Sequence, residues 1–347
     1  MQGIHGGDIY RNQVDIDFSV NINPLGIPKE VEAALKEAVE ECCHYPDITA
    51  RALKQAVCVM LDVPQEYLLF GNGASELFMA IVHAIRPQRI VIPVPSFYGY
   101  EHAAAAVSSE VVYYEMHDNN DFELGEDFLK VLVEKKDLIL LANPNNPTGK
   151  TMSQEYLRRL LLYCKEKEIY VVLDECFIEF CDKGLSLITE LEQFDNLIIV
   201  RAFTKIFAIP GVRLGYLVCS NQLLTDQINR QLPEWNLSVF AQKAGIACTS
   251  QKDYLEKTVD LVKQERQFLT NNLEQLGIRV IPGQADFILL YSEAPLYELL
   301  LEKGILIRDC TNFRGLSSGF YRIAVKNRKE NEILIHTLKN VLQKGKQ

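Results

Sequence analysis

The sequence predicts a large α/β domain built on a mostly parallel sheet, followed by a smaller α+β domain. From about residue 28 to residue 250, apolar runs of strand length alternate with longer stretches of helical periodicity, which is typical of a layered α/β domain. Several runs, such as LILLA and YVVL, are apolar throughout, so we expect them to be buried on both faces between helices, as parallel strands usually are. After residue 250 the chain changes to one long charged helical segment and then to short strands.

Seven apolar runs are the expected strands of the large sheet. Their bounds are 67–70, 89–93, 110–114, 137–142, 169–174, 196–201 and 214–219. The segments between them supply the helices. Pro28 suits the first turn of one helix, and Ser153 is the expected N-cap of an amphipathic one.

The part after residue 250 predicts the smaller domain. The expected elements are a helix over 252–276, short strands near Arg279, Phe287, Ile305 and Tyr321, and a closing helix from Lys329. No Ser/Gly/Pro-rich linker separates the two parts, so we expect the long helix to join them. We therefore divide the chain into an N-terminal arm at 1–27, a large domain at 28–250 and a small domain at 251–347.

Composition favours a small-molecule ligand. The chain has 347 residues and a formal net charge of -10, which opposes binding to nucleic acid or to an anionic membrane. The start MQGIHGGDIYRN has no basic region followed by an apolar one, and no apolar run approaches the roughly 18 residues of a spanning helix. We therefore expect a cytoplasmic protein without a membrane partner.

The cysteines and histidines give no support to a disulfide framework or a metal site. The nine cysteines include no CxxC pair, and their odd number without a secretory signal fits reduced thiols. The six histidines never occur at a metal-ligand spacing such as HxH or HExxH. We expect no bound metal.

Two loops that follow predicted strands have the composition of ligand-binding loops. In GNGASE, residues 71–76, the small residues Gly73, Ala74 and Ser75 let backbone amides at a helix start face an anion. A plain tight turn is the alternative, and a dinucleotide fingerprint is disfavoured because Glu76 stands where a glycine is needed. The second loop, NPNNPTG at 143–149, can direct an amide towards a ligand, although turn chemistry explains most of it.

Charged residues follow two further strands. Asp174 and Glu175 end the run YVVL, and a buried carboxylate in such a place needs a partner. Lys205 and Arg213 flank a glycine turn after another strand. Open α/β sheets bind ligands at the carboxyl ends of their strands, so all four motifs are expected to meet in one site.

Together, the four motifs resemble the fold-type I aminotransferases that depend on pyridoxal 5′-phosphate (PLP), in the same order and over nearly the whole chain. The block TKIFAIPGVRLGY is the most specific match. The resemblance implies a PLP cofactor bound to Lys205 as a Schiff base. It also implies that Asp174 pairs with the pyridine nitrogen, and a nearby carboxylate raises the pKa of such a nitrogen by roughly 1 to 3 units.

The same resemblance implies the remaining contacts of the cofactor. Asn146 is expected to bond the phenolic oxygen, and Phe97, in PSFYGY, to stack on the ring. The phosphate is expected to lie against Thr204, Arg213 and the amides around Gly73, Ala74 and Ser75. Tyr45, in HYPD, matches a tyrosine that reaches the phosphate from a partner subunit, which implies a symmetric homodimer with shared sites.

The chain departs from the family pattern at two positions. Phe177, in DECFIEF, stands where many relatives have a tyrosine that bonds the phenolic oxygen, so Asn146 is left to do this alone. Ala202 stands where relatives often have a hydroxyl for the phosphate, so Thr204 must carry more of that contact.

Within the family, the chain most resembles the L-threonine-O-3-phosphate decarboxylases of cobalamin synthesis and, after them, the histidinol-phosphate aminotransferases. The signals are HGGD near the start, DFSVNINPLG, Phe177, and RDCTNFRGL followed by FYRIAVK. The resemblance implies that Arg322 binds the substrate carboxylate. It also implies that three residues contact the substrate near its phosphate and carboxylate, namely His5, Asn21 and Arg308.

The local charge agrees with an anionic substrate. Residues 308–329 include six basic residues and one acid, in a chain that is acidic overall. Arginine suits bidentate binding of carboxylate or phosphate. A solvated basic face is the alternative for four of the six, which are Arg314, Lys326, Arg328 and Lys329.

The reaction type stays open at this point. PLP labilises the Cα bond that stands perpendicular to its ring, so the same residues can serve decarboxylation or transamination. A fold without catalysis, used for binding, would lack Lys205 or carry a DNA-binding extension, and a nucleotide-dependent oxidoreductase would need a complete glycine fingerprint. The sequence has none of these features.

Overall fold

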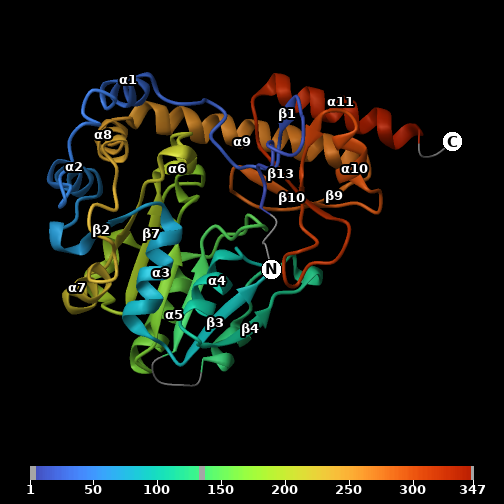
Figure 1. The fold of residues 1–347 in the computed structure, drawn as a ribbon. Coiled ribbons are helices and arrows are strands. Elements are labelled where there is room, and N and C mark those ends of the chain that lie inside the picture. Colours follow the sequence, from blue (N-terminus) through green and yellow to red (C-terminus); the bar gives the residue numbers. More distant parts are fainter. Residues whose placement is uncertain (1–4, 133–136, 345–347) are drawn as a thin grey trace.

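A seven-stranded sheet and a smaller antiparallel sheet organise the molecule (Figure 1). The computed structural model describes residues 5–132 and 137–344. The first four residues of the predicted arm and the last three of the predicted small domain lie outside the described residues.

The large sheet has the strand order β2-β8-β7-β6-β5-β3-β4. Strand β8 runs antiparallel to both neighbours, whereas the other pairs are parallel. The seven-stranded, mostly parallel sheet predicted from the sequence is confirmed. No strand end differs from the predicted one by more than one residue. The strands are β2 (Leu68–Gly71), β3 (Arg89–Val94), β4 (Glu110–Glu115), β5 (Leu138–Ala142), β6 (Tyr170–Asp174), β7 (Leu197–Ala202) and β8 (Gly215–Val218).

The central strands are buried on both faces, which explains their continuous apolar sequence. Alternate residues of β5 enter two different core clusters: Ile139 packs with helix α5 on one face, and Leu140 with α3 and α4 on the other. The helices of this part are α1 (Lys29–Glu37), α2 (Arg51–Leu61), α3 (Ala74–Ile85), α4 (Gly99–Ala106), α5 (Gln154–Glu166), α6 (Phe203–Ile206), α7 (Gln222–Asn229) and α8 (Val239–Cys248).

Short connections complete the large part of the fold. The 3-10 helices are η1 (Gln65–Tyr67), η2 (Asp118–Asn120), η3 (Glu126–Val131), η4 (Ile178–Phe180), η5 (Ile188–Gln193) and η6 (Pro210–Val212). The predicted cap of α5 is present, because the Ser153 hydroxyl accepts a hydrogen bond from the Tyr156 amide at 3.1 Å.

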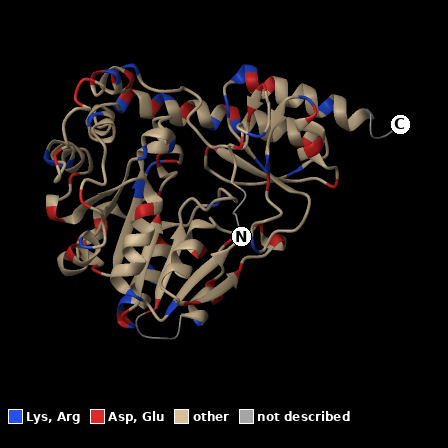
Figure 2. Ribbon diagram, in the orientation of Figure 1, with Lys and Arg blue, Asp and Glu red and all other residues tan. Residues whose placement is uncertain are grey.

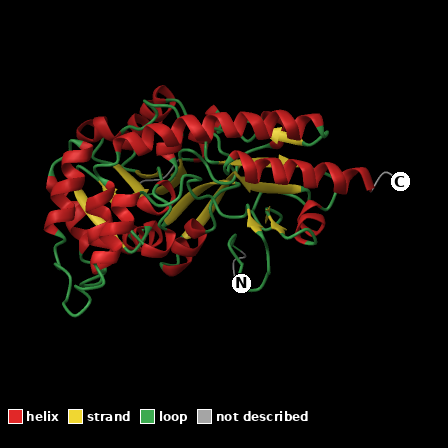
Figure 3. Ribbon diagram, turned by 90° about the horizontal axis from the view of Figure 1, so that it is seen from above, coloured by secondary structure: helices red, strands yellow, loops and turns green. Residues whose placement is uncertain are grey.

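The second sheet is antiparallel, with the order β12-β13-β10-β9. Its strands are β9 (Arg279–Ile281), β10 (Phe287–Tyr291), β12 (Arg308–Asp309) and β13 (Phe320–Ala324), and the helices beside it are α9 (Lys252–Gln275), α10 (Leu296–Leu301) and α11 (Arg328–Lys344). The two long helices α9 and α11 lie side by side (Figure 3). The buried Glu265 of α9 joins them, because it accepts hydrogen bonds from Arg328 at 3.0 Å and Asn331 at 2.9 Å.

The N-terminal segment packs against the C-terminal part of the chain. Strand β1 (Ile16–Asp17) pairs in parallel with β11 (Ile305–Leu306). The Phe18 amide then donates to the Leu306 carbonyl at 2.7 Å, and the Ala324 amide donates to the Phe18 carbonyl at 2.8 Å. Residues 16–18 are thereby fixed between two strands that come almost 300 positions later in the chain.

Charged residues are concentrated on the helices and connecting loops, whereas most of the central sheet carries none (Figure 2). In the two described stretches of the chain, no helix has both the length and the apolar composition needed to cross a membrane.

Candidate active site

A cavity of about 790 Å³ lies at the carboxyl ends of three central strands of the large sheet. The last residues of β5, β6 and β7, which are Ala142, Asp174 and Ala202, all line it. This is the edge where open α/β sheets bind ligands. Fourteen of the fifteen site residues predicted from the sequence line this cavity: His5, Asn21, Gly73, Ala74, Ser75, Phe97, Asn146, Asp174, Phe177, Thr204, Lys205, Arg213, Arg308 and Arg322.

The Asp174 carboxylate is oriented by two hydrogen bonds. The Tyr100 hydroxyl donates to Oδ2 at 2.6 Å, and the Cys176 amide donates to Oδ1 at 2.9 Å. Burial raises the pKa of Asp174, whereas the hydrogen bonds from Cys176 and Tyr100 lower it. A protonated pyridine nitrogen would place a positive charge beside this buried carboxylate, so Asp174 suits the ring of PLP.

Lys205 lies three residues beyond the end of β7, on the short helix α6. Burial lowers the pKa of its amine, the nearby Arg322 and Arg213 lower it further, and Asp286 opposes them. A lowered pKa increases the fraction of neutral amine, which is the nucleophilic form. The lysine is therefore suited to bind an aldehyde such as that of PLP.

The phosphate end of the cavity is shaped by glycines. Helix α3 begins at Ala74. Gly73 before it has a φ of +78°, a backbone conformation that residues with a side chain rarely adopt. A Cβ atom at Gly73 would collide with the Arg213 guanidinium, and one at Gly215 would lie 2.7 Å from the Ala74 amide nitrogen. The helix start and Arg213 therefore form a cradle whose amides and positive charge suit a phosphate.

Two buried arginines stand together at the other end of the cavity. Arg308 of β12 and Arg322 of β13 are direct cross-strand partners, exposed by only 6% and 7%. Like charges directly opposite each other in a sheet are unfavourable. Burial lowers the pKa of Arg322 to about 10, and Arg308 also lowers it.

Hydrogen bonds hold both guanidinium groups in place. Arg322 donates to the Asn146 side-chain oxygen and, at 3.0 Å, to the Ser19 carbonyl. Because this contact uses the oxygen of Asn146, its NH₂ group remains the part that can donate to a ligand, as the predicted bond to a phenolic oxygen requires. Arg308 donates to the Asn312 side-chain oxygen and to the Asp309 carbonyl, both at 2.7 Å.

The N-terminal segment brings two further predicted residues to the same end. The His5 ring lies 6.4 Å from the ring of Phe97, and burial, Arg308 and His102 lower the pKa of His5. Asn21 is buried, and its side-chain oxygen has no hydrogen-bond partner among the described residues.

Tyr45 is the one predicted site residue outside the cavity. Its side chain is 83% exposed, and its ring lies 5.0 Å from that of Trp235. The sequence assigned Tyr45 to the site of a partner subunit, and a position outside the cavity of its own chain is compatible with that prediction.

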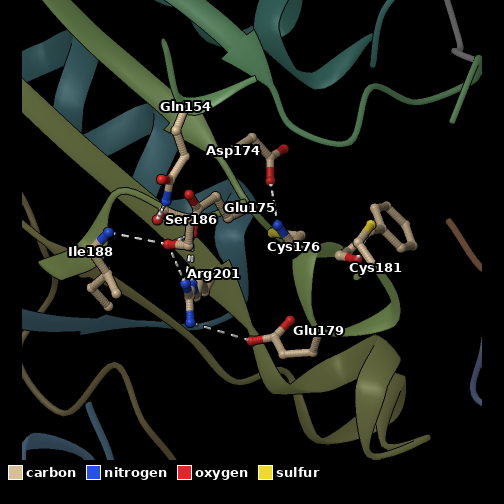
Figure 4. A network of polar contacts seen from close by, with 10 residues as sticks. Gln154, Asp174, Glu175, Cys176, Glu179, Cys181, Ser186, Ile188 and Arg201 are labelled. Carbon is tan, nitrogen blue, oxygen red and sulfur yellow. Dashed lines mark hydrogen bonds and ion pairs between the residues drawn. The ribbon is translucent and has the colours of Figure 1, made fainter. Parts of the chain in front are cut away.

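A buried ion pair links the strand that carries Asp174 to the strand that leads to Lys205 (Figure 4). Arg201 of β7 donates to the Glu175 carboxylate at 2.9 and 2.7 Å, and to the Ser186 hydroxyl at 2.7 Å. Glu175 is 0% exposed. The sequence indicated that a carboxylate here needs a partner, and Arg201 is that partner.

Sequence reasoning missed three residues around the site, namely Tyr100, Arg201 and Asp286. Tyr100 lies three positions after Phe97 in PSFYGY, and a tyrosine at a buried helix start needs a partner for its hydroxyl. Arg201 ends an apolar strand, which is also a usable signal. Asp286, in QADFILL, has the composition of an ordinary turn before a strand, so nothing local marks it.

The fold and the cavity define a class of protein. The Aminotransferase class I and II family matches residues 13–338, and the chain belongs to this family. It is an enzyme of this class, and PLP is the cofactor of the family, as the sequence predicted.

Individual relatives narrow the class further. The chain is 37% identical to a putative threonine-phosphate decarboxylase of Caldanaerobacter subterraneus subsp. tengcongensis, over 98% of this chain and 94% of the relative. It is 34% identical to the threonine-phosphate decarboxylase of Salmonella typhimurium, over 94% and 91%. Among solved structures, the histidinol-phosphate aminotransferase of Clostridium acetobutylicum superposes with a TM-score of 0.89 at 33% identity, covering 95% of this chain and 99% of the other. Decarboxylases and aminotransferases of phosphorylated substrates are thus both similar to this chain.

Proposed function

We propose that this enzyme decarboxylates L-threonine O-3-phosphate to (R)-1-amino-2-propanol O-2-phosphate in cobalamin biosynthesis. The observation that carries the proposal is the pair of buried arginines, Arg308 and Arg322, which face each other across two strands in the cavity. Two adjacent buried cations are best compensated by a ligand with two anionic groups. L-Threonine O-3-phosphate has a carboxylate and a phosphate close together, and the name of the Salmonella relative specifies this substrate class.

The residues at the two ends of the cavity have different roles in the proposed reaction. When bound, PLP supplies an electron sink for the negative charge that forms at the substrate Cα. Arg322 anchors the substrate carboxylate, and Arg308 with His5 binds the substrate phosphate. Lys205 would hold the cofactor through its side-chain amine. Phe97 and Phe177, which line the cavity, would exclude water from the bound cofactor.

Histidinol-phosphate aminotransferase is the second candidate. It is supported by the similarity to the Clostridium acetobutylicum structure and by a relative in Methanosarcina mazei that is 30% identical over 92% of this chain and 86% of its own length. Histidinol phosphate carries no carboxylate, so it would occupy only one of the two arginines, whereas the acceptor 2-oxoglutarate has two carboxylates and would occupy both. The identity of 37% and 34% to two threonine-phosphate decarboxylases therefore favours the decarboxylase.

One experiment separates the two candidates. The purified enzyme is incubated with L-threonine O-3-phosphate alone, and separately with histidinol phosphate and 2-oxoglutarate. Carbon dioxide from the first mixture without any 2-oxo acid is the expected result. Rapid glutamate formation in the second mixture, without carbon dioxide in the first, would overturn the proposal.

We also propose a cytoplasmic homodimer in which Tyr45 reaches the cofactor phosphate of the partner subunit. The exposure of Tyr45 supports it, because a large aromatic side chain on the surface is typical of an interface. The nine cysteines are free thiols, as is usual in a reducing compartment. The division into an arm at 1–27, a large domain at 28–250 and a small domain at 251–347 is likewise our proposal, supported by the two separate sheets.

A further inference from the structure

Six consecutive residues between strands β12 and β13, here called the 311–316 segment, all line the cavity. They come from the part of the chain that carries the small sheet, whereas Glu101 and Phe97, which line the same cavity, belong to helix α4 and to the loop before it. The Arg314 side chain is 50% exposed although it lines the cavity, so it lies where the cavity meets the solvent. The 311–316 segment therefore borders the opening of the cavity.

Arg314 joins this segment to the large sheet and to the helix beside it. Its Nε donates to a carboxylate oxygen of Glu101 on α4 at 3.1 Å. Its guanidinium carbon lies 4.0 Å from the centre of the Tyr113 ring on β4, within the range of a cation–π contact. Arg314 and Glu101 are 213 positions apart in the chain. The alternative left open by the sequence, a purely solvated basic residue, therefore does not apply to Arg314.

Gly315 brings the backbone of the segment against the same part of the fold. Its φ is +85°, a conformation that favours glycine. A Cβ atom at this position would lie 3.3 Å from the backbone nitrogen of Pro95, just beyond strand β3. The two main chains thus approach closely beside the contacts that the Arg314 side chain makes.

The first half of the segment contacts Arg308, the buried cation proposed to bind the substrate phosphate. The Asn312 side-chain oxygen accepts a hydrogen bond from Arg308 at 2.7 Å. The centre of the Phe313 ring lies 5.2 Å from the Arg308 guanidinium carbon. Arg314 follows these two residues directly in the chain. Its contacts with Glu101 and the large sheet therefore fix the position of the residues that hold Arg308.

We propose that Arg314 is a positioning residue: by holding the 311–316 segment against α4 and β4, it fixes the side chains that orient Arg308 towards the substrate phosphate. The inference rests on the proposed function only for the role of Arg308. An exposed ion pair contributes little to the stability of a fold, so loss of Arg314 is expected to change substrate binding more than folding. The contacts of Arg314 described above do not involve Lys205 or Asp174, so kcat is expected to change less than KM.

The first test is Arg314→Met in the full-length enzyme loaded with PLP. Loss of an exposed ion pair together with a cation–π contact corresponds to a factor of roughly 3 to 30. KM for L-threonine O-3-phosphate is expected to rise by this factor, and kcat to stay within about twofold. Arg314→Lys keeps the positive charge but not the planar group that stacks on Tyr113, so it is expected to recover part of the loss. An unchanged KM in Arg314→Met would overturn the proposal.

The variant Glu101→Met distinguishes positioning by Arg314 from direct binding of the substrate. It removes a negative charge from the lining of the cavity, so it would strengthen binding of an anionic substrate if Arg314 held that substrate itself. If Arg314 acts through the 311–316 segment, Glu101→Met releases the segment and raises KM, as Arg314→Met does. A lower or unchanged KM in Glu101→Met would contradict the proposal.

The matched control is Arg279→Met. Arg279 of β9 also joins the small sheet to the large part of the fold, through ion pairs with Asp118 at 2.7 Å and Asp121 at 3.2 Å. Its side chain is 43% exposed, similar to that of Arg314, but Arg279 is not among the described residues that line the cavity. KM is expected to stay unchanged. An equal rise in both arginine variants would mean that any contact between the two parts has this effect, and the assignment to Arg314 would be wrong.

A second measurement does not depend on the substrate. The Phe313 and Leu316 amides donate hydrogen bonds to nearby carbonyls at 2.9 and 3.1 Å, so their exchange with deuterium reports opening of the segment. In the enzyme loaded with PLP but without substrate, exchange is expected to be faster in Arg314→Met and Glu101→Met than in the wild type and Arg279→Met. Equal exchange in all four proteins would overturn the proposal. If L-threonine O-3-phosphate is not a substrate, the proposed function fails, whereas the exchange rates still decide whether Arg314 holds the segment.

Discussion

Replacing Arg308 by methionine is expected to abolish preference for the phosphorylated substrate while leaving the cofactor in place. Methionine keeps an unbranched side chain of similar length in a 6% exposed position but removes the guanidinium. Arg308 lies on the small sheet next to Arg322, and it is not among the groups that form the cradle of Gly73 and Arg213. Binding of the PLP phosphate should therefore change little.

The size of the effect follows from burial and charge. Truncating one partner of a buried, hydrogen-bonded charge pair costs about 2 to 5 kcal/mol. At about 1.4 kcal/mol for each factor of ten, this is a loss of roughly 30- to 4,000-fold in kcat/KM for L-threonine O-3-phosphate. The cross-strand repulsion between Arg308 and Arg322 is relieved in the variant, which places the expected loss in the lower half of this range.

The assay compares kcat/KM for L-threonine O-3-phosphate with kcat/KM for L-threonine, which has the carboxylate but no phosphate. The wild type should strongly prefer the phosphorylated substrate, and Arg308→Met should lose the preference through the phosphorylated substrate alone. PLP affinity, measured by fluorescence titration, is the control. An equal loss with both substrates, or a parallel loss of PLP affinity, would refute the assignment of Arg308 to the substrate phosphate.

Four other predictions follow from the same structure. Lys205→Ala should abolish the borohydride-reducible link to PLP and leave the circular dichroism spectrum intact, whereas a reducible link in the variant would place the cofactor on another lysine. Tyr45→Ala should weaken PLP binding without loss of monomer stability, because the side chain is 83% exposed in the single chain. Sedimentation of the wild type should show a dimer. A fully active monomer would exclude the shared site. Arg201→Met should lower the free energy of unfolding in urea by about 3 to 5 kcal/mol, because it leaves the Glu175 carboxylate buried without its cation. The double variant with Glu175→Gln should recover much of the lost stability. If it recovers none, the ion pair is not the cause of the loss. Burial raises the pKa of Asp286 to about 7, so the native state retains a proton that the unfolded chain releases near pH 4. The free energy of unfolding should therefore fall as pH rises from about 4 to 7, and Asp286→Asn should flatten this pH dependence. An unchanged pH dependence in the variant would mean that the carboxylate is ionised throughout this range.

The sequence was sufficient for the large sheet and for most of the cavity, for physical reasons. Strands buried on both faces, such as β5 with LILLA, have a continuous apolar pattern whose length defines their ends. Motifs at the carboxyl ends of such strands must meet at one edge, so Asp174 and Lys205 could be assigned to the same site before any coordinates were known.

The residues that were missed are those whose importance depends on burial by distant segments. Asp286 precedes an ordinary strand, and its full burial depends on distant segments such as α9, whose Arg266 donates to the carbonyls of Gln284 and Ala285. Tyr100 contacts Asp174 across 74 positions of sequence, and no local pattern encodes such a pairing. Tyr45 was assigned to a partner subunit through the family resemblance alone, and that assignment stays a prediction.

The position of the N-terminal segment has a consequence for synthesis of the protein. Strand β1 has its partner at residues 305–306, and Ser19 and Asn21, which line the cavity, follow it directly. During translation, some 280 residues must emerge between this segment and its partner, so the residues from His5 to Asn21 leave the ribosome long before they can be fixed in place. The seven strands of the large sheet end at Val218, so they leave the ribosome before β11 and β13, and the lining of the cavity is complete only after Arg322 has emerged. A chain that ended after α8 would lack both Arg308 and Arg322, and with them the cation pair of the proposed substrate site.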